Sequence, residues 1–121
     1  MSLSEPAQRQ AQVQQAPYWG VIADDLTGAC DCGGAFTRYG FTTGVYCDGR
    51  YSGKSANDVL VIPTYSRGSP ENIAFTRVLE TAQQLVNRQV QGFYKKIDST
   101  LKGNLRIEIE AALSGLPQTL A

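Results

Sequence analysis

Residues 18–31 read YWGVIADDLTGACD, and this stretch decides the fold. The run from Tyr18 to Ala23 is short, apolar and rich in β-prone residues, and it stops at a pair of acids. This pattern predicts a buried strand. The small residues from Thr27 to Tyr39 predict a helix, and Gly40 is well placed to end it. A strand that leads directly into a helix is the first unit of an α/β fold.

The rest of the chain repeats this alternation. The further predicted strands are 41–47, 59–62 and 93–97. The triplet Ser69-Pro70-Glu71 predicts a helix start with the serine as N-cap, and the apolar stripe of a last helix begins at Leu105. The sequence therefore predicts an α/β, three-layer fold: a mostly parallel sheet of about four strands with helices on its faces, as in a truncated Rossmann-like domain.

Composition restricts the function classes. The 121 residues carry 11 Lys plus Arg and 11 Asp plus Glu, so the net charge is zero and nothing favours nucleic acid or an anionic membrane as a partner. No apolar run approaches the roughly 20 residues that span a bilayer, and the start has no signal-peptide pattern, so we expect a cytoplasmic protein. Residues 1–17 are rich in Gln and predict a disordered N-terminal tail, which leaves residues 18–121 as one domain.

The cysteines are Cys30, Cys32 and Cys47, and the chain has no histidine. An odd number of cysteines argues against a disulfide framework. A zinc site would need an Asp or a water as its fourth ligand. We therefore expect no metal site, and interpret the first two cysteines as small buried residues on a helix.

In parallel sheets ligands bind beyond the carboxyl ends of the strands, so the residues that follow the predicted strands are the candidates. Asp24 and Asp25 follow the first strand and could accept hydrogen bonds from substrate hydroxyls, hold Mg²⁺ or supply a general base. The alternative is that Asp25 or Thr27 caps the next helix, which accounts for one acid but not for both. Arg67 follows the third strand and suits a carboxylate or a phosphate, unless it is a solvated loop residue.

The segment 95–104 surrounds the end of the fourth strand and leads into the last helix. A helix N-terminus with Lys96 and Lys102 nearby favours an anion site. The alternative is a polar turn in which Asp98 or Ser99 accepts hydrogen bonds from backbone donors. Such a turn does not require both lysines, and we therefore favour the anion site.

These segments together resemble the four-carbon acid sugar kinase family. The family typically has a D-D-[LF]-T-G-A-x-D stretch after its first strand, which matches Asp24–Asp31. A T-x-S-R segment matches Thr64–Arg67, and a K-K-x-D-S-T-L-R-G-N segment matches Lys95–Asn104, with Glu108 and Glu110 in the helix beyond. Three motifs in the same order make the resemblance specific, and it covers the chain from about Trp19 to Leu116.

The resemblance implies an ATP-dependent phosphorylation of a hydroxyl on a small sugar acid of the threonate, erythronate or 3-oxo-tetronate class. Arg67 and Lys96 would bind the substrate carboxylate, and Asp24 or Asp25 would contact its hydroxyls. Lys102 stands where the family usually has Arg, which loses paired hydrogen bonding. No catalytic residue is assigned. The candidate substrate-binding residues are Asp24, Asp25, Thr27, Arg67, Lys96, Asp98, Ser99, Lys102, Gly103 and Asn104.

Length limits what these residues could do alone. Members of the family are the size of two or more ordinary domains, with an N-terminal substrate-binding and a C-terminal nucleotide-binding domain. The resemblance therefore implies only the first half of a substrate-binding domain, no nucleotide-binding domain and no kinase activity from these residues alone. ATP and Mg²⁺ are implied for the full-length family, and a separate nucleotide-binding chain is one expected partner. The alternatives are a non-enzymatic module that binds small acids and a structural remnant, either of which would act as a homo-oligomer.

Overall fold

The computed structural model describes residues 17–48, 57–98 and 100–116. The predicted tail lies, apart from Pro17, outside the described residues. All strand pairings are parallel, and the strand order is β2-β3-β1-β4. The predicted α/β fold with a parallel sheet of about four strands is thus confirmed. The elements are β1 (Trp19–Ala23), α2 (Leu26–Arg38), β2 (Thr43–Val45), β3 (Val59–Pro63), α3 (Glu71–Asn87), β4 (Gly92–Lys96) and α4 (Leu105–Gly115).

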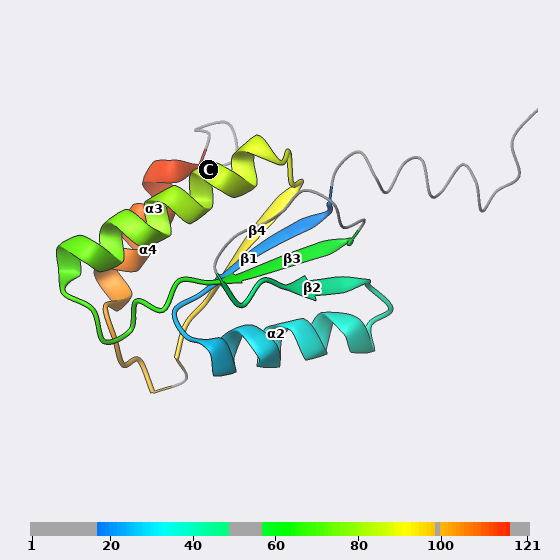
Figure 1. Cartoon of the computed structure of the whole chain (residues 1–121), viewed down its shortest axis with the longest axis horizontal. Coiled ribbons are helices and arrows are strands. Elements are labelled where there is room, and N and C mark those ends of the chain that lie inside the picture. The colour runs from blue at the N-terminus through cyan, green and yellow to red at the C-terminus, as the bar shows by residue number, and fades with distance from the viewer. Residues whose placement is uncertain (1–16, 49–56, 99, 117–121) are drawn as a thin grey trace, which may run out of the picture.

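Helices cover both faces of the sheet, with α2 on one side and α3 and α4 on the other (Figure 1). Strand β3 explains this arrangement, because its successive side chains point to opposite faces. Val59 and Val61 belong to the apolar cluster under α2, whereas Leu60 and Ile62 belong to the cluster under α3 and α4. All four are fully buried. The continuous apolar run of β3 is therefore that of a parallel strand covered on both faces.

Several element boundaries shift by one residue from the prediction, and two differences have a structural explanation. The second strand was expected over 41–47 but spans only Thr43–Val45, the three residues that are in register with Val59–Val61 of β3. The expected N-cap Ser69 lies one residue too early, since Pro70 occupies the N-cap and α3 begins at Glu71. The Ser69 hydroxyl bonds the carbonyl of Tyr65 instead, at 3.4 Å. A contact with the preceding loop has therefore replaced the local helix cap.

The carboxyl ends of three adjacent strands lie at one level. Ala23, the last residue of β1, is in register with Pro63 of β3 and with Lys96 of β4. In Figure 1 these ends meet to the left of the sheet, beside the starts of α2 and α4. Segments that follow β1, β3 and β4 are thereby placed next to one another, as expected for parallel strands.

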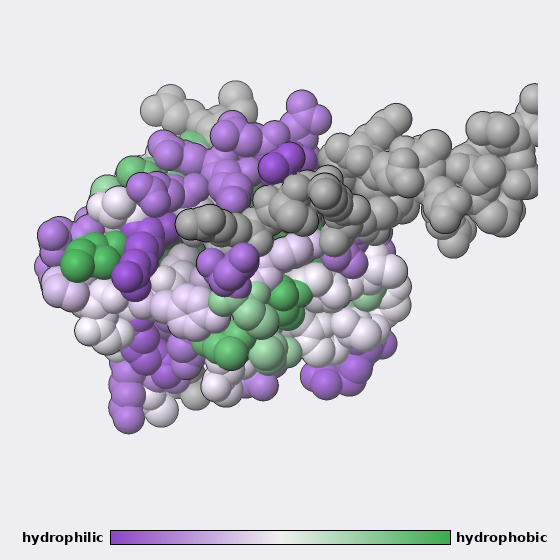
Figure 2. All heavy atoms as spheres, viewed as in Figure 1, coloured by the Kyte–Doolittle hydropathy of each residue, from purple (hydrophilic) through white to green (hydrophobic). Residues whose placement is uncertain are grey.

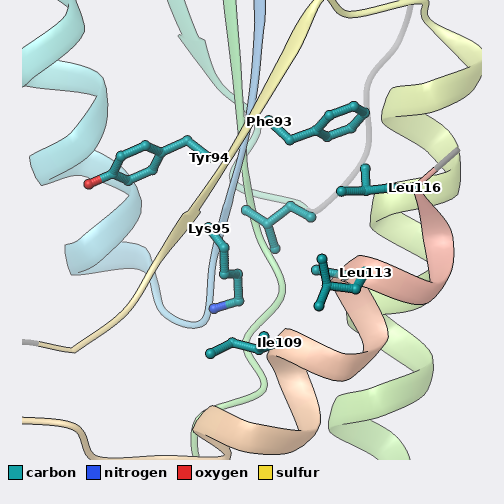
Figure 3. A pocket seen from close by; sticks show the side chains of 8 residues that line it. Phe93, Tyr94, Lys95, Ile109, Leu113 and Leu116 are labelled. Carbon is teal, nitrogen blue, oxygen red and sulfur yellow. The ribbon is translucent and has the colours of Figure 1, made fainter. Parts of the chain in front are cut away.

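In the described part of the chain, β4 lies at an edge of the sheet. Phe93 and Lys95 point from β4 toward α4, and Tyr94 points to the opposite side (Figure 3). Between β4 and α4 lies an apolar groove of about 210 Å³. The groove is lined by Ile22, Phe93, Tyr94, Lys95, Ile109, Ala112, Leu113 and Leu116.

In the view of Figure 2 the surface over α3 is mostly hydrophilic, and a group of hydrophobic residues lies near α2.

Candidate functional site

The centre of the candidate site is an ion pair between the segments that follow β1 and β3. Arg67 Nε donates to Oδ2 of Asp24 at 3.1 Å, and Nη2 donates to Oδ1 at 3.1 Å. This is the two-point geometry for which a guanidinium and a carboxylate are matched. Asp24 is buried, with 5% of its surface exposed. The backbone reinforces the contact, since the amides of Ser66 and Arg67 both donate to the carbonyl of Asp24, at 3.0 and 3.4 Å.

Two further carboxylates complete what we call the Arg67 cluster: Arg67, Asp24, Asp25 and Asp98. Arg67 Nη1 lies 3.2 Å from Oδ2 of Asp25, and Nη2 lies 3.6 Å from Oδ1 of Asp98. The cluster raises the pKa of Arg67, first through its hydrogen bond with Asp24. One cation is thus held by three acids from the ends of β1 and β4, and four of the predicted site residues lie together.

Asp25 has two roles in the structure. Its Oδ1 accepts a hydrogen bond of 2.8 Å from the amide of Gly28, so Asp25 is the N-cap of α2. A Cβ on Gly28 would lie 2.8 Å from that oxygen, so the side chain of Asp25 would have to shift. The helix-cap interpretation therefore explains one oxygen of Asp25, while the other faces Arg67. Thr27 is exposed in the first turn of α2.

The loop after β4 folds around Asp98. Its Oδ2 accepts hydrogen bonds from the amides of Thr100 and Lys102, at 3.2 and 3.1 Å, and from the hydroxyl of Thr100. The pKa of Asp98 is lowered, most of all by the hydrogen bond from the Thr100 hydroxyl. The backbone hydrogen bonds and the charge of Arg67 lower it further. Oδ2 of Asp98 therefore has the role of the predicted alternative, a polar turn in which this side chain accepts hydrogen bonds from backbone amides. Ser99 lies outside the described residues.

Among the described residues, Lys96 and Lys102 form no ion pair with the acids of the cluster. Lys96 Nζ donates to the carbonyl of Ile97 at 2.6 Å. Lys102 is exposed, and its backbone amide donates to Asp98. Both ammonium groups are thus close to the cluster in sequence, without an ion pair to its acids among the described residues. They remain able to bind an anion.

Gly103 and Asn104 bring this loop against the one after β3. Gly103 has a φ of +92°, and a Cβ there would lie 3.1 Å from both Arg67 Cγ and Asp24 Oδ2. Only glycine fits this left-handed conformation at such close range. Asn104 Nδ2 donates to the carbonyls of Ser66 and Ser69, at 3.0 and 2.8 Å. Its amide fixes the Arg67 loop instead of capping α4.

Sequence reasoning missed a buried acid behind the cluster. Glu108 is 1% exposed, and its Oε2 accepts a hydrogen bond of 2.8 Å from the hydroxyl of Ser66. Its Oε1 lies 3.1 Å from Nζ of Lys95, although no aligned hydrogen bond reaches this oxygen. One signal was available: Glu108 falls three residues after Leu105 and four before Ala112, within the apolar stripe of the predicted helix.

The arrangement does not fit a metal ion. Within the described ranges, no group of three or more His, Cys, Asp or Glu side chains is placed to hold one. The three aspartates face a guanidinium instead. Cys30 and Cys47 are exposed, while Cys32 is buried and its thiol pKa is raised, first by that burial. The site can thus offer carboxylate acceptors for hydroxyls and cationic donors for an acid group.

A profile of the family described as the sugar-binding N-terminal domain matches residues 19–121. The chain belongs to this family. The resemblance to sugar acid kinases is thereby confirmed at the level of the family. No described helix combines the length and the hydropathy of a membrane-spanning segment.

Named relatives of this sugar-binding N-terminal domain are sugar acid kinases. The chain is 37% identical over 101 residues to the D-threonate kinase of Bordetella bronchiseptica, covering 79% of this chain and 25% of that one. It is 41% identical over 106 residues to the D-erythronate kinase of Heliobacterium modesticaldum, covering 84% and 24%. It is 38% identical over 103 residues to the 3-oxo-tetronate kinase of Haemophilus influenzae, covering 80% and 25%. The chain thus spans about a quarter of the length of these relatives.

Solved structures show the same fold. A crystal structure of a domain of unknown function from Bordetella bronchiseptica matches with a TM-score of 0.76 and 35% identity. The match covers 82% of this chain and 26% of that one. That protein is described as a domain-swapped dimer with bound citrate, and a second crystal form matches equally well, at a TM-score of 0.76. The three-layer fold is therefore that of the family.

Proposed function

We propose that these residues form the substrate-binding part of an ATP-dependent kinase that phosphorylates a hydroxyl of a four-carbon sugar acid. We further propose that, by themselves, they bind the acid without transferring phosphate. The observation that carries the proposal is the Arg67 cluster, in which segments from three parallel strands meet at one rim of the sheet. The names of the relatives support the class of substrate.

The roles follow from hydrogen-bonding capacity. A guanidinium has five N–H donors, and Asp24 accepts two of those of Arg67. Asp98, whose Oδ1 lies 3.6 Å from Nη2, has the longest contact with Arg67 of the three acids. We propose that the substrate carboxylate replaces Asp98 on Nη2 and that Lys96 adds a second cation. Asp24 and Asp25, which carry acceptor oxygens only, would then bind hydroxyls.

We propose that these residues hold neither ATP nor Mg²⁺ by themselves. The aspartates that could bind a cation are engaged with Arg67, and no three acids are placed around a metal position in the described ranges. We therefore derive no step through either group. In a kinase, ATP supplies the phosphoryl group, and the proposed contribution of these residues is to bind and orient the sugar acid.

Calorimetric titration of the 121-residue chain with D-threonate and D-erythronate tests the binding proposal. We expect heat of binding from at least one of them, and saturation at 100 times the dissociation constant should add about 2.7 kcal/mol to the free energy of unfolding. Arg67→Met should abolish the heat. The matched control is Arg106→Met, which changes an arginine that is 85% exposed. If neither acid binds the unmodified chain, the proposed function is wrong.

Phosphate transfer is tested separately. With Mg-ATP and D-threonate the chain alone should give no phosphorylated product. Addition of the remaining, nucleotide-binding part of the Bordetella relative, produced separately, should restore turnover. Turnover by the 121 residues alone would refute the proposal that they only bind the acid.

A non-enzymatic module that binds small acids as a homo-oligomer is the second candidate. The specific observation in its favour is the relative described as a domain-swapped dimer with bound citrate. Citrate shares the carboxylate but is not a four-carbon sugar acid. Binding of citrate as tight as that of D-threonate, together with a dimer mass by light scattering and no response to the nucleotide-binding part, would favour this candidate.

A further inference from the structure

Glu108 is costly to keep where it is. It lies in the first turn of α4 with 1% of its surface exposed, and the neighbouring buried residues of this helix, Ala111 and Ala112, are apolar. Replacing a buried ion pair by well-packed apolar residues is often neutral or stabilising. The fold alone therefore does not require an acid at this position. Its contacts suggest another reason for it.

Glu108 connects the ends of the strands that carry the site. Lys95, its ion-pair partner at 3.1 Å, also donates a hydrogen bond of 2.9 Å to the carbonyl of Lys96 at the end of β4. Ser66 is its hydrogen-bond partner, and the hydroxyl oxygen of Ser66 lies 2.7 Å from that of Thr64. That hydroxyl lies 3.2 Å from the carbonyl of Ala23 at the end of β1. In Figure 3 the side chain of Lys95 reaches from β4 toward α4.

Ser66 is the link between this buried network and the Arg67 cluster. Its amide donates to the carbonyl of Asp24, and its own carbonyl accepts from Asn104 Nδ2 at 3.0 Å. Its hydroxyl donates to Glu108. The three polar groups of this one residue are thus all fixed, immediately before Arg67 in the chain. A binding site needs its side chains held to about 0.5 Å, and such support comes from contacts behind the site.

We infer that Glu108 is a positioning residue, which fixes Ser66 and thereby aims the guanidinium of Arg67 at the substrate acid. It acts through Ser66 and has no hydrogen bond or ion pair with the Arg67 cluster among the described residues. The inference rests on the proposed function for the identity of the ligand. The orientation of the Arg67 side chain, however, can be measured without a ligand.

The test separates the charge of Glu108 from its hydrogen bond to Ser66. Glu108→Leu combined with Lys95→Met replaces the buried pair by apolar residues and removes the Ser66 acceptor. Glu108→Gln combined with Lys95→Met also removes both charges but leaves an amide oxygen for the Ser66 hydroxyl. We expect the first variant to lose at least tenfold in affinity for D-threonate or D-erythronate. The second should stay within about threefold of the unmodified chain.

Thermal unfolding of each variant is measured as a control. A loss of stability alone should not make the two variants differ in their affinity for the sugar acid. If the first variant binds as tightly as the unmodified chain, the inference is wrong. If it does not fold, Ser66→Ala replaces it, and the same tenfold loss is expected. An affinity of Ser66→Ala equal to that of the unmodified chain would equally overturn the inference.

A second measurement keeps the inference apart from the proposed function. The Nε–H of Arg67, which donates to Asp24, should give a separate and exchange-protected signal in a ¹⁵N–¹H spectrum of the ligand-free chain. We expect Glu108→Leu/Lys95→Met to move this signal to the position of a solvated arginine, and Glu108→Gln/Lys95→Met to preserve it. If no sugar acid binds but the signals behave in this way, the proposed function fails and the positioning role stands. Unchanged signals in both variants refute the positioning role.

Discussion

Arg67→Met should be among the most destabilising single substitutions outside the apolar core. It leaves the carboxylate of Asp24, whose side chain is 7% exposed, without its cation. Removing one partner of a buried pair typically costs about 3–5 kcal/mol. Because the Arg67 side chain is itself 35% exposed and water can enter its place, we expect about 2–3 kcal/mol at pH 7. Urea unfolding followed by circular dichroism measures this loss.

A double-mutant cycle shows whether the cost belongs to the pair. Asp24→Asn alone should cost about 1–2 kcal/mol, because the amide keeps the shape but loses the charge. The loss of stability in the double variant should be smaller than the sum of the two single losses by about 1–2 kcal/mol, as is usual for contacting residues. Arg106→Met, in an exposed pair with Glu110, should change stability by no more than about 0.5 kcal/mol. If Arg67→Met costs no more than this control, the Arg67 cluster does not exist in solution.

Three other predictions concern single positions around and behind the cluster. Gly103→Ala should destabilise by about 1–2 kcal/mol in urea unfolding, because φ is +92° and the new Cβ meets atoms at 3.1 Å; Gly68→Ala, with open space around its Cβ, is the control and should stay within about 0.5 kcal/mol. The pKa of Asp98 is lowered in the folded chain, so its stabilising effect is present above the unfolded value of about 3.9 and is lost as the pH falls through the lower folded pKa. Asp98→Asn should therefore flatten the pH dependence of the unfolding free energy below about pH 4, and an unchanged slope would contradict the hydrogen bonds assigned to this carboxylate. The thiol of Cys32, buried and with a raised pKa, should react with Ellman's reagent at pH 8 much more slowly than the two exposed thiols, and a single rate for all three would contradict its burial.

The order of the elements could be predicted because local and long-range signals agree. Apolar runs such as Val59–Ile62 are both β-prone and long enough to be covered on two faces, so either signal gives the same strand. The cap at Ser69 failed because local propensity competed with a tertiary contact. The hydroxyl of this serine bonds the Tyr65 carbonyl and lies 3.3 Å from Nη1 of Arg77, a residue of α3. Such a partner eight residues away is not visible in a capping pattern.

The meeting of Asp24, Arg67 and Asp98 could also be predicted, since parallel strands place their carboxyl ends at one edge. Their pairing could not. The sequence indicates which charged residues lie near one another, but not which carboxylate oxygens a guanidinium contacts. In the structure Arg67 forms ion pairs with three aspartates of its own chain. Glu108 was missed for a related reason, because a carboxylate at a helix start is usually a solvated group near the positive end of the dipole. Only the positions of Ser66 and Lys95 make its burial tolerable.

The charges of the cluster also set how an acid ligand could enter it. Three aspartates around one arginine leave an excess of two negative charges, and a bound sugar acid would add a third. Arg67 alone cannot compensate this excess, so a second cation must approach when the acid binds. Lys96 lies two residues before Asp98, and its ammonium group donates to the Ile97 carbonyl and forms no ion pair among the described residues. If the proposed function is correct, the carboxylate end of the ligand therefore lies between Arg67 and Lys96, and its hydroxyl end lies against Asp24 and Asp25.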